Sequence, residues 1–222
     1  LFSYTDVHKI MSTYGRTTGT NHDPVTHFYE TFLGEYDPKR RKARGVYYTP
    51  LPVVQYIVNA VDTVLKTEFD LPDGLADDST ITQTVRVEGY KKGKGTGKVH
   101  HRDEVEIPRV QILDPATGTG TFLNETIKLI AKRKQHLGSG WNSYVEDNLL
   151  PRIHGFEILM AAYSMAHMRL GLTLAETGYV PSAQHPRIGV YLTNSLEEPA
   201  KDEPPLLAML GMGRALTEEA IA

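Results

Sequence analysis

The feature that most constrains the fold is an alternation of strand-like and helix-like segments between residues 109 and 196. Three apolar runs typical of buried strands are RVQILD (109–114), RIHGFEI (152–158) and PRIGVYLTNSL (186–196). Segments with helical spacing of apolar residues separate them at 122–135 and 159–178, with a further short helix expected within 141–150. Strands that alternate with helices form a parallel sheet with crossover helices, so the sequence predicts an α/β fold.

The segments on either side of this alternation have a different character. Residues 1–43 are expected to form a helical N-terminal segment, and a second amphipathic helix is expected from residue 53 to residue 69. Residues 79–108 contain two β-like arms around KKGKGTGK, which predicts a hairpin or loop insertion. Its lysines form either a solvated tip or a contact with a DNA backbone. The predicted domains are therefore 1–43, 44–196 and a tail at 197–222.

Composition limits the class of protein. The chain of 222 residues has a net charge of −3, so any contact with nucleic acid must come from a local basic patch. It contains no cysteine, which excludes disulfides and Cys-ligated zinc and favours an intracellular setting. No apolar run approaches the length of a membrane span, about 18 residues. The first residue is Leu1 rather than Met, and we expect the chain to be part of a longer protein.

The first strand runs into the loop ILDPATGTG, which is a candidate binding site. Ligands of open parallel sheets lie beyond the carboxyl ends of the strands, and Gly118 and Gly120 allow the backbone a sharp turn. No lysine follows these glycines, which disfavours a nucleoside triphosphate, and Leu123 stands where a dinucleotide fingerprint has its third glycine. A nucleoside without phosphates remains, such as the cation S-adenosylmethionine beside Asp114. The plain alternative is a glycine turn capped by an ordinary aspartate.

The ends of the other two strands carry further polar side chains. Glu157 in GFEI could accept hydrogen bonds from a ribose diol, or could be an ordinary surface carboxylate. Asn194 in TNSL could donate to and accept from an adenine edge, or could form a turn. Because carboxyl ends of parallel strands share one edge of the sheet, we expect both residues near the bend at Gly118.

Taken together, these segments resemble a known family. GVYYTP (45–50), DPATGTGTFL (114–123), GFEI (155–158) and TNSL (193–196) occur in the order of motifs X, I, II and III of N6-adenine DNA methyltransferases from restriction–modification systems. The preceding stretch from His27 to Pro50 resembles the large single-chain (Type I-like, ISP-type) enzymes of this group, which also carry nuclease and translocase parts. The resemblance implies a Rossmann-like S-adenosylmethionine-dependent methyltransferase fold, with S-adenosylmethionine as cofactor.

The resemblance also implies a role for each matching residue. Tyr47, Tyr48, Thr49 and Pro50 would cover the methionine end of the cofactor. The methionine and sulfonium would be lined by Asp114, Pro115, Ala116, Thr117, Gly118, Gly120 and Thr121. The ribose would be bound at Glu157 and Ile158, and the adenine would lie against Asn194, Ser195 and Leu196. The family often has Asp at the position of Asn194 and Cys or Ser at that of Thr117.

The catalytic element of the family is not recognisable in this sequence. Methylation of an exocyclic amine requires (N/D/S)PP(Y/F/W), whose polar groups accept from the amine and whose ring stacks on the flipped base. Glu203-Pro204-Pro205-Leu206 has the prolines but neither the proper acceptor nor the aromatic ring, and it follows motif III too closely. We therefore predict no catalytic residue in the chain. Neither a HExxH metal motif nor a Ser-His-Asp set is recognisable either.

These observations leave three hypotheses open. The first is a fragment of a DNA adenine-N6 methyltransferase, completed by downstream catalytic and target-recognition regions and acting on double-stranded DNA. The second is a non-catalytic module that docks DNA or a neighbouring domain and retains a vestigial cofactor loop. The third keeps the methyltransferase but changes the substrate to RNA or protein.

Overall fold

The computed structural model describes residues 49–90, 98–183 and 186–196, with the backbone alone for 85–90 and 98–103. The chain divides into two compact units, Leu1–Ile57 and Val58–Ala222, and each is treated by itself. The predicted helical segment at 1–43 and the predicted tail at 197–222 lie outside the described residues. The domain boundaries expected beside them stay predictions.

A parallel sheet of three strands organises the second unit. Its strands are β3 (Ile112–Asp114), β4 (Ile153–Glu157) and β5 (Gly189–Leu192), in the spatial order β3-β4-β5. Every residue of the central strand β4 is buried, because a neighbour pairs with it on each side and helices cover it. The α/β fold expected from the sequence is confirmed.

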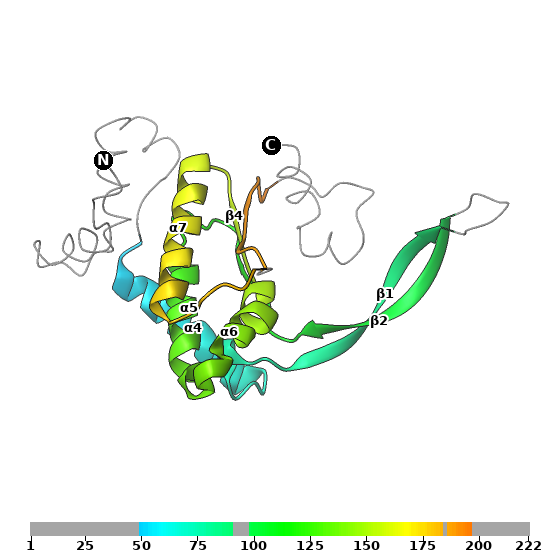
Figure 1. Cartoon of the computed structure of the whole chain (residues 1–222), viewed down its shortest axis with the longest axis horizontal. Helices are drawn as coiled ribbons and strands as arrows, with labels where there is room; N and C mark the ends of the chain where they lie inside the picture. Colours follow the sequence, from blue (N-terminus) through cyan, green and yellow to red (C-terminus); the bar gives the residue numbers. More distant parts are fainter. Residues whose placement is uncertain (1–48, 91–97, 184–185, 197–222) are drawn as a thin grey trace, which may run out of the picture. The chain divides into compact units, whose positions relative to one another are not determined.

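Two crossover helices connect these strands. Helix α5 (Thr121–Arg133) follows β3, helix α7 (Met160–Glu176) follows β4, and the two lie side by side (Figure 1). The apolar face predicted for α5 is confirmed, since Leu123, Ile127 and Ile130 are at most 1% exposed. Buried apolar residues of α7, namely Ala162, Ala166, Leu170 and Leu174, complete this layer.

A run of short helical turns leads from α5 to β4. It consists of η3 (Lys134–Gly140), α6 (Trp141–Tyr144), the π-helical turn η4 (Val145–Leu149) and η5 (Leu150–Arg152). The short helix predicted within 141–150 is therefore present. Val145 and Leu149 are fully buried, so this connection is part of the core.

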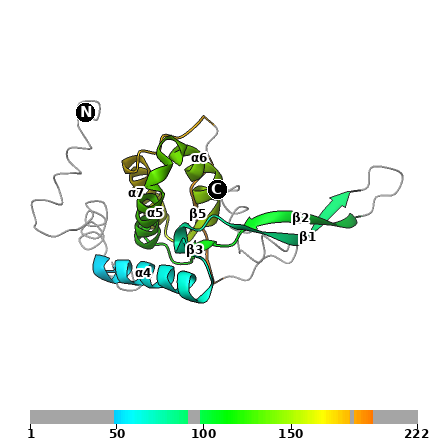
Figure 2. The same cartoon turned by 90° about the horizontal axis from the view of Figure 1, so that it is seen from below.

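Helix α4 (Leu51–Glu68) precedes an antiparallel ribbon formed by β1 (Thr80–Tyr90) and β2 (Lys98–Pro108) (Figure 2). The helix and the hairpin predicted here are confirmed. Among the described strands, β1 and β2 pair only with each other. A two-stranded ribbon is marginally stable by itself. The contacts that hold the base of this ribbon are therefore structurally important. None of the described helices combines the length and apolar character that a membrane span requires.

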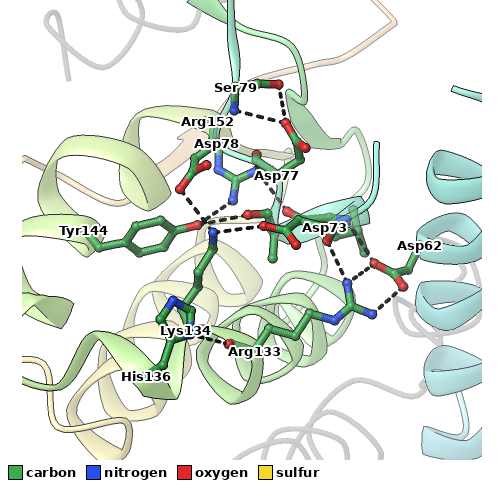
Figure 3. Close-up of polar contacts among 12 residues, drawn as sticks. Asp62, Asp73, Asp77, Asp78, Ser79, Arg133, Lys134, His136, Tyr144 and Arg152 are labelled. Atoms are coloured by element: carbon green, nitrogen blue, oxygen red, sulfur yellow. Dashed lines mark hydrogen bonds and ion pairs between the residues drawn. The ribbon is translucent and has the colours of Figure 1, made fainter. Parts of the chain in front are cut away.

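Cationic side chains bind the segment 71–79, which leads from α4 into the ribbon (Figure 3). Arg152 is 1% exposed, and its Nη1 donates to the carbonyl oxygens of Leu75 and Asp77, both at 2.9 Å. Its Nη2 donates to the Tyr144 hydroxyl at 3.0 Å. These bonds satisfy both terminal nitrogens of a buried guanidinium, which would be costly to bury without partners.

A second contact joins α4 to the end of α5. Arg133 donates two hydrogen bonds to the carboxylate of Asp62, one to each oxygen, and a third to the Asp73 carbonyl at 2.8 Å. The Leu75 amide also donates to Asp62 Oδ1 at 3.0 Å. Burial by itself raises the pKa of Asp62, but the hydrogen bonds from Arg133, Leu75 and Lys66 outweigh it and lower the pKa to about 2.

Replacing Asp62 by Asn should destabilise the protein in a pH-dependent way. The pKa falls from 3.8 to about 2 on folding, which corresponds to about 2 kcal/mol at about 1.4 kcal/mol per pKa unit. This stabilisation is present above the unfolded pKa and is lost as the pH falls through the folded one. Urea unfolding of both proteins should therefore differ by about 2 kcal/mol at neutral pH, and converge as the pH is lowered.

The matched control for this prediction is Asp147→Asn. Asp147 is exposed, and its substitution should change the free energy of unfolding by less than about 0.5 kcal/mol. An Asp62→Asn protein as stable at neutral pH as this control would contradict the role given to the Asp62–Arg133 pair.

Candidate cofactor site at the carboxyl ends of the parallel strands

The loop after β3 folds back over the end of β4. The Thr117 amide donates to the Phe156 carbonyl at 2.9 Å, and the Thr117 hydroxyl donates to the Asp114 carbonyl at 2.9 Å. Gly118 and Gly120 both have positive φ values, 56° and 80°, which residues with a side chain rarely adopt. The two glycines thus supply the sharp turns expected from the sequence.

Glu157 holds this loop against the sheet. Its Oε2 accepts a hydrogen bond from the Gly118 amide, and its Oε1 accepts one from the Leu159 amide, both at 2.8 Å. The structure therefore brings together Glu157 and Gly118, which are 39 residues apart. Each carboxylate oxygen keeps a further lone pair, so a ribose contact at Glu157 remains compatible with this geometry and stays a prediction.

Asp114 lies beside this arrangement with one carboxylate oxygen unsatisfied. Its Oδ1 accepts from the Ala116 amide at 3.2 Å, whereas its buried Oδ2 has no hydrogen-bond partner among the described residues. Burial raises the pKa of Asp114, and the charge of Glu157 raises it further. Two carboxyl groups near one glycine loop create a negative potential that favours a cation.

The end of β5 lies next to the end of β4. The Thr193 amide donates to the Glu157 carbonyl at 2.9 Å, and Asn194 Oδ1 accepts from the Leu196 amide at 3.1 Å. Asn194 thus forms a turn with its own backbone, which was one of its two expected roles. Its contact with an adenine edge stays a prediction. Ile158, Ser195 and Leu196 are exposed, and their roles also stay predictions.

The residues predicted to cover the methionine end are only partly described. Tyr47 and Tyr48 lie outside the described residues. Thr49 is half-buried, and the Pro50 carbonyl accepts from the amides of Val53 and Val54, which starts helix α4. Thr49 and Pro50 belong to the first compact unit, so their part in a cofactor site stays a prediction.

Gly155 is a site residue that sequence reasoning missed. A Cβ built on Gly155 would lie 2.4 Å from the Thr117 hydroxyl oxygen and 3.0 Å from Leu123 Cδ1. The loop can therefore pack against β4 only because this strand position lacks a side chain. A glycine inside an apolar strand often marks a close approach of another backbone, and that signal was present in RIHGFEI.

A separate hollow of about 360 Å³ lies near the ends of α5 and α7. Its lining includes Ala131, Lys134, Trp141 and Thr177, none of which was predicted to bind a ligand. Within the part of the chain that the structure describes, no group of three or more His, Asp or Glu residues is arranged to hold a metal ion.

Substituting Gly155 by Ala should destabilise the loop. The new methyl group would overlap Thr117, which two hydrogen bonds hold in place, and overpacking of this kind costs about 1–3 kcal/mol. Thermal unfolding measures the effect. Gly171→Ala is the control, since a Cβ there meets nothing within 4 Å and alanine in a helix is more stable than glycine by up to about 1 kcal/mol. Equal melting temperatures for the two variants would show that the loop does not seat on β4.

Comparisons with known proteins place this geometry in context. The family model for N-6 DNA methylases matches residues 20–76, upstream of the glycine loop. A putative type II restriction enzyme and methyltransferase of Methanocaldococcus jannaschii is 26% identical over 166 residues. That match covers 70% of this chain but 14% of the relative, so the chain spans about a seventh of the relative's length.

Three solved structures have a fold similar to that of this chain. A DrdV–DNA complex has a TM-score of 0.51 at 25% identity and covers 79% of this chain and 13% of that one. A nuclease-deletion mutant of the Type ISP restriction–modification enzyme LlaGI, bound to a DNA substrate mimic, has a TM-score of 0.53 at 22% identity. It covers 87% of this chain and 13% of that one. The Type ISP enzyme LlaBIII bound to DNA also scores 0.53 at 22% identity, covering 89% and 11%. The predicted resemblance to N6 DNA methylases of restriction–modification enzymes is confirmed, and the two Type ISP enzymes share the fold.

Proposed function

We propose that this chain binds S-adenosylmethionine and forms the cofactor-binding part of a DNA adenine-N6 methyltransferase in a restriction–modification enzyme. One observation carries the proposal. Two carboxyl groups, Asp114 and Glu157, end adjacent parallel strands, and one of them is hydrogen-bonded to the intervening glycine loop at Gly118. This is the edge at which open parallel sheets bind nucleosides.

The residues at this edge suit the charge of the cofactor. S-adenosylmethionine carries a positive ammonium group and a positive sulfur, and when bound it supplies the methyl group on that sulfur. The buried Asp114 Oδ2, which no described residue satisfies, could accept from the ammonium group. The free lone pairs of Glu157 could accept from the ribose hydroxyls.

The proposed substrate is adenine in double-stranded DNA. It is supported by the name of the curated relative, a restriction enzyme and methyltransferase, and by structural neighbours that were solved on DNA. The proposed catalytic and target-recognition regions belong to the same polypeptide, together with nuclease or translocase parts, in a prokaryotic cytoplasm. The residues that bind the flipped base would come from those regions, since the sequence carries no recognisable (N/D/S)PP(Y/F/W) element.

Asp114→Asn should weaken binding of S-adenosylmethionine by about tenfold or more, because a charge-assisted hydrogen bond contributes about 1.5–3 kcal/mol. Binding should also weaken as the pH falls. The pKa of Asp114 is raised, so its carboxylate takes up a proton at a higher pH than an ordinary aspartate and no longer attracts a cation. Calorimetric titration of the protein at several pH values measures both effects. Asp147→Asn is the matched control and should bind like the wild type. Equal affinities for all three proteins would show that Asp114 does not contribute to binding of S-adenosylmethionine.

The intact protein should transfer labelled methyl groups from S-adenosylmethionine to adenine N6 of duplex DNA. Digestion of the product to nucleosides, followed by mass spectrometry, identifies the methylated base. Label on cytosine, on RNA or on protein would contradict the proposed substrate while leaving the cofactor assignment intact. Salt-dependent binding of DNA without any binding of S-adenosylmethionine would instead favour a docking module with a vestigial cofactor loop.

A further inference from the structure

We propose that Arg169 is a positioning residue of the cofactor site, which holds the Thr121 hydroxyl so that its proton is available to a carboxylate of the ligand. This inference rests on the proposed function, and it deepens it. The carboxylate in question is that of the amino-acid part of S-adenosylmethionine. Neither Arg169 nor a specific role for the Thr121 hydroxyl was expected from the sequence.

The contact between the two residues is short and buried. Arg169 lies on α7 and is 3% exposed, and Thr121 is the first residue of α5 and is 8% exposed. Arg169 Nη1 donates to Thr121 Oγ1 at 2.7 Å. The contact therefore links the middle of one crossover helix to the point where the glycine loop ends and the other helix begins.

The direction of this hydrogen bond determines where the hydroxyl proton is directed. A guanidinium group has donors but no acceptor, so Thr121 Oγ1 must be the acceptor. The Thr121 proton must then be donated to another group. Other threonines of the unit already have acceptors: Thr126 donates to the Phe122 carbonyl at 2.9 Å, and Thr177 to the Leu174 carbonyl at 2.6 Å. Thr121 has no acceptor among the described residues, so its proton can be given to a ligand.

The electrostatics beside Thr121 favour a negative ligand group. The amides at the start of α5 carry the positive end of the helix dipole, and the guanidinium of Arg169 adds a full positive charge. Asp114 and Glu157, by contrast, make the β-strand side of the loop negative. A zwitterionic amino acid fits such a division, with its ammonium group toward Asp114 and its carboxylate toward Thr121.

Tight packing between the helices fixes Arg169 in this position. A Cβ on Gly120 would lie 3.4 Å from Ala166 Cβ, one turn before Arg169. One turn after it, the Thr173 hydroxyl donates to Asn124 Oδ1. These contacts hold α7 against α5 on both sides of Arg169, which fixes the backbone from which the side chain reaches Thr121.

The test compares two ligands that differ only in the carboxylate: S-adenosylmethionine and decarboxylated S-adenosylmethionine. Calorimetry on the intact protein measures both affinities for wild type, Arg169→Met, Thr121→Val and Thr121→Ser. We expect Arg169→Met and Thr121→Val each to weaken S-adenosylmethionine by about tenfold, the loss of one hydrogen bond to a charged group. Both should bind the decarboxylated ligand within about twofold of wild type, and Thr121→Ser should bind both ligands normally.

Each other outcome overturns a stated part of the argument. Equal weakening of the two ligands would mean that Arg169 supports the fold alone, and unchanged affinities would show that Thr121 does not contact the carboxylate. If Arg169→Met fails to fold, Thr121→Val carries the test, because valine has nearly the same shape as threonine. A wild-type protein that binds neither ligand would overturn the proposed function itself, and this inference with it. Asp114→Asn should weaken binding of both ligands, because both carry the ammonium group. This result would distinguish the ammonium end of the site from the carboxylate end.

Discussion

The hydrogen bond from the Gly118 amide to Glu157 is the interaction on which the candidate site depends. It joins the loop after β3 to the last residue of β4, so the position of the glycine loop depends on the neighbouring strand as well as on its own two glycines. A carboxylate that accepts from the main chain imposes a position on the loop, and the positive φ values of Gly118 and Gly120 allow the backbone to adopt it. The second oxygen of Glu157 accepts from Leu159 at the entry to α7, so the same group also sets the start of that helix.

Helix α5 connects this site to the base of the ribbon. Its first turn receives Arg169 and Thr173 from α7. At its other end Arg133 binds Asp62, and Lys134, just beyond the helix, reaches Asp73 and Asp78 at 3.3 and 3.1 Å. The helix therefore carries polar contacts at both ends and an apolar face between them. A displacement of the glycine loop would have to be accommodated by α7, which packs along the same helix.

Much of the fold follows from local pattern, because strand and helix periodicity is a short-range property. The three strands, both crossover helices and the β1–β2 hairpin could be predicted in this way, and Asp114, Gly118 and Glu157 were placed at one edge by strand order alone. The polar contacts between distant segments could not be predicted in this way. Asp62 and Arg133 are 71 residues apart, and Arg169 and Thr121 are 48 apart, and no short-range spacing links such pairs. Gly155 was recognisable as a glycine inside an apolar strand, but the sequence alone did not show which backbone would approach it.

The attachment of segment 71–79 has a consequence for how far related sequences can diverge. Arg152 donates to the carbonyl oxygens of Leu75 and Asp77, groups that every amino acid possesses. Substitutions at Leu75 and Asp77 can therefore accumulate without removing these two hydrogen bonds, provided that the arginine persists. Three positions of the segment are more constrained: the φ of 57° and the closeness to Asp62 exclude a side chain at Gly74, and the carboxylates of Asp73 and Asp78 bind Lys134. Because the acceptors of these hydrogen bonds are main-chain carbonyl groups, related proteins can keep the same fold after most of their sequence similarity has been lost.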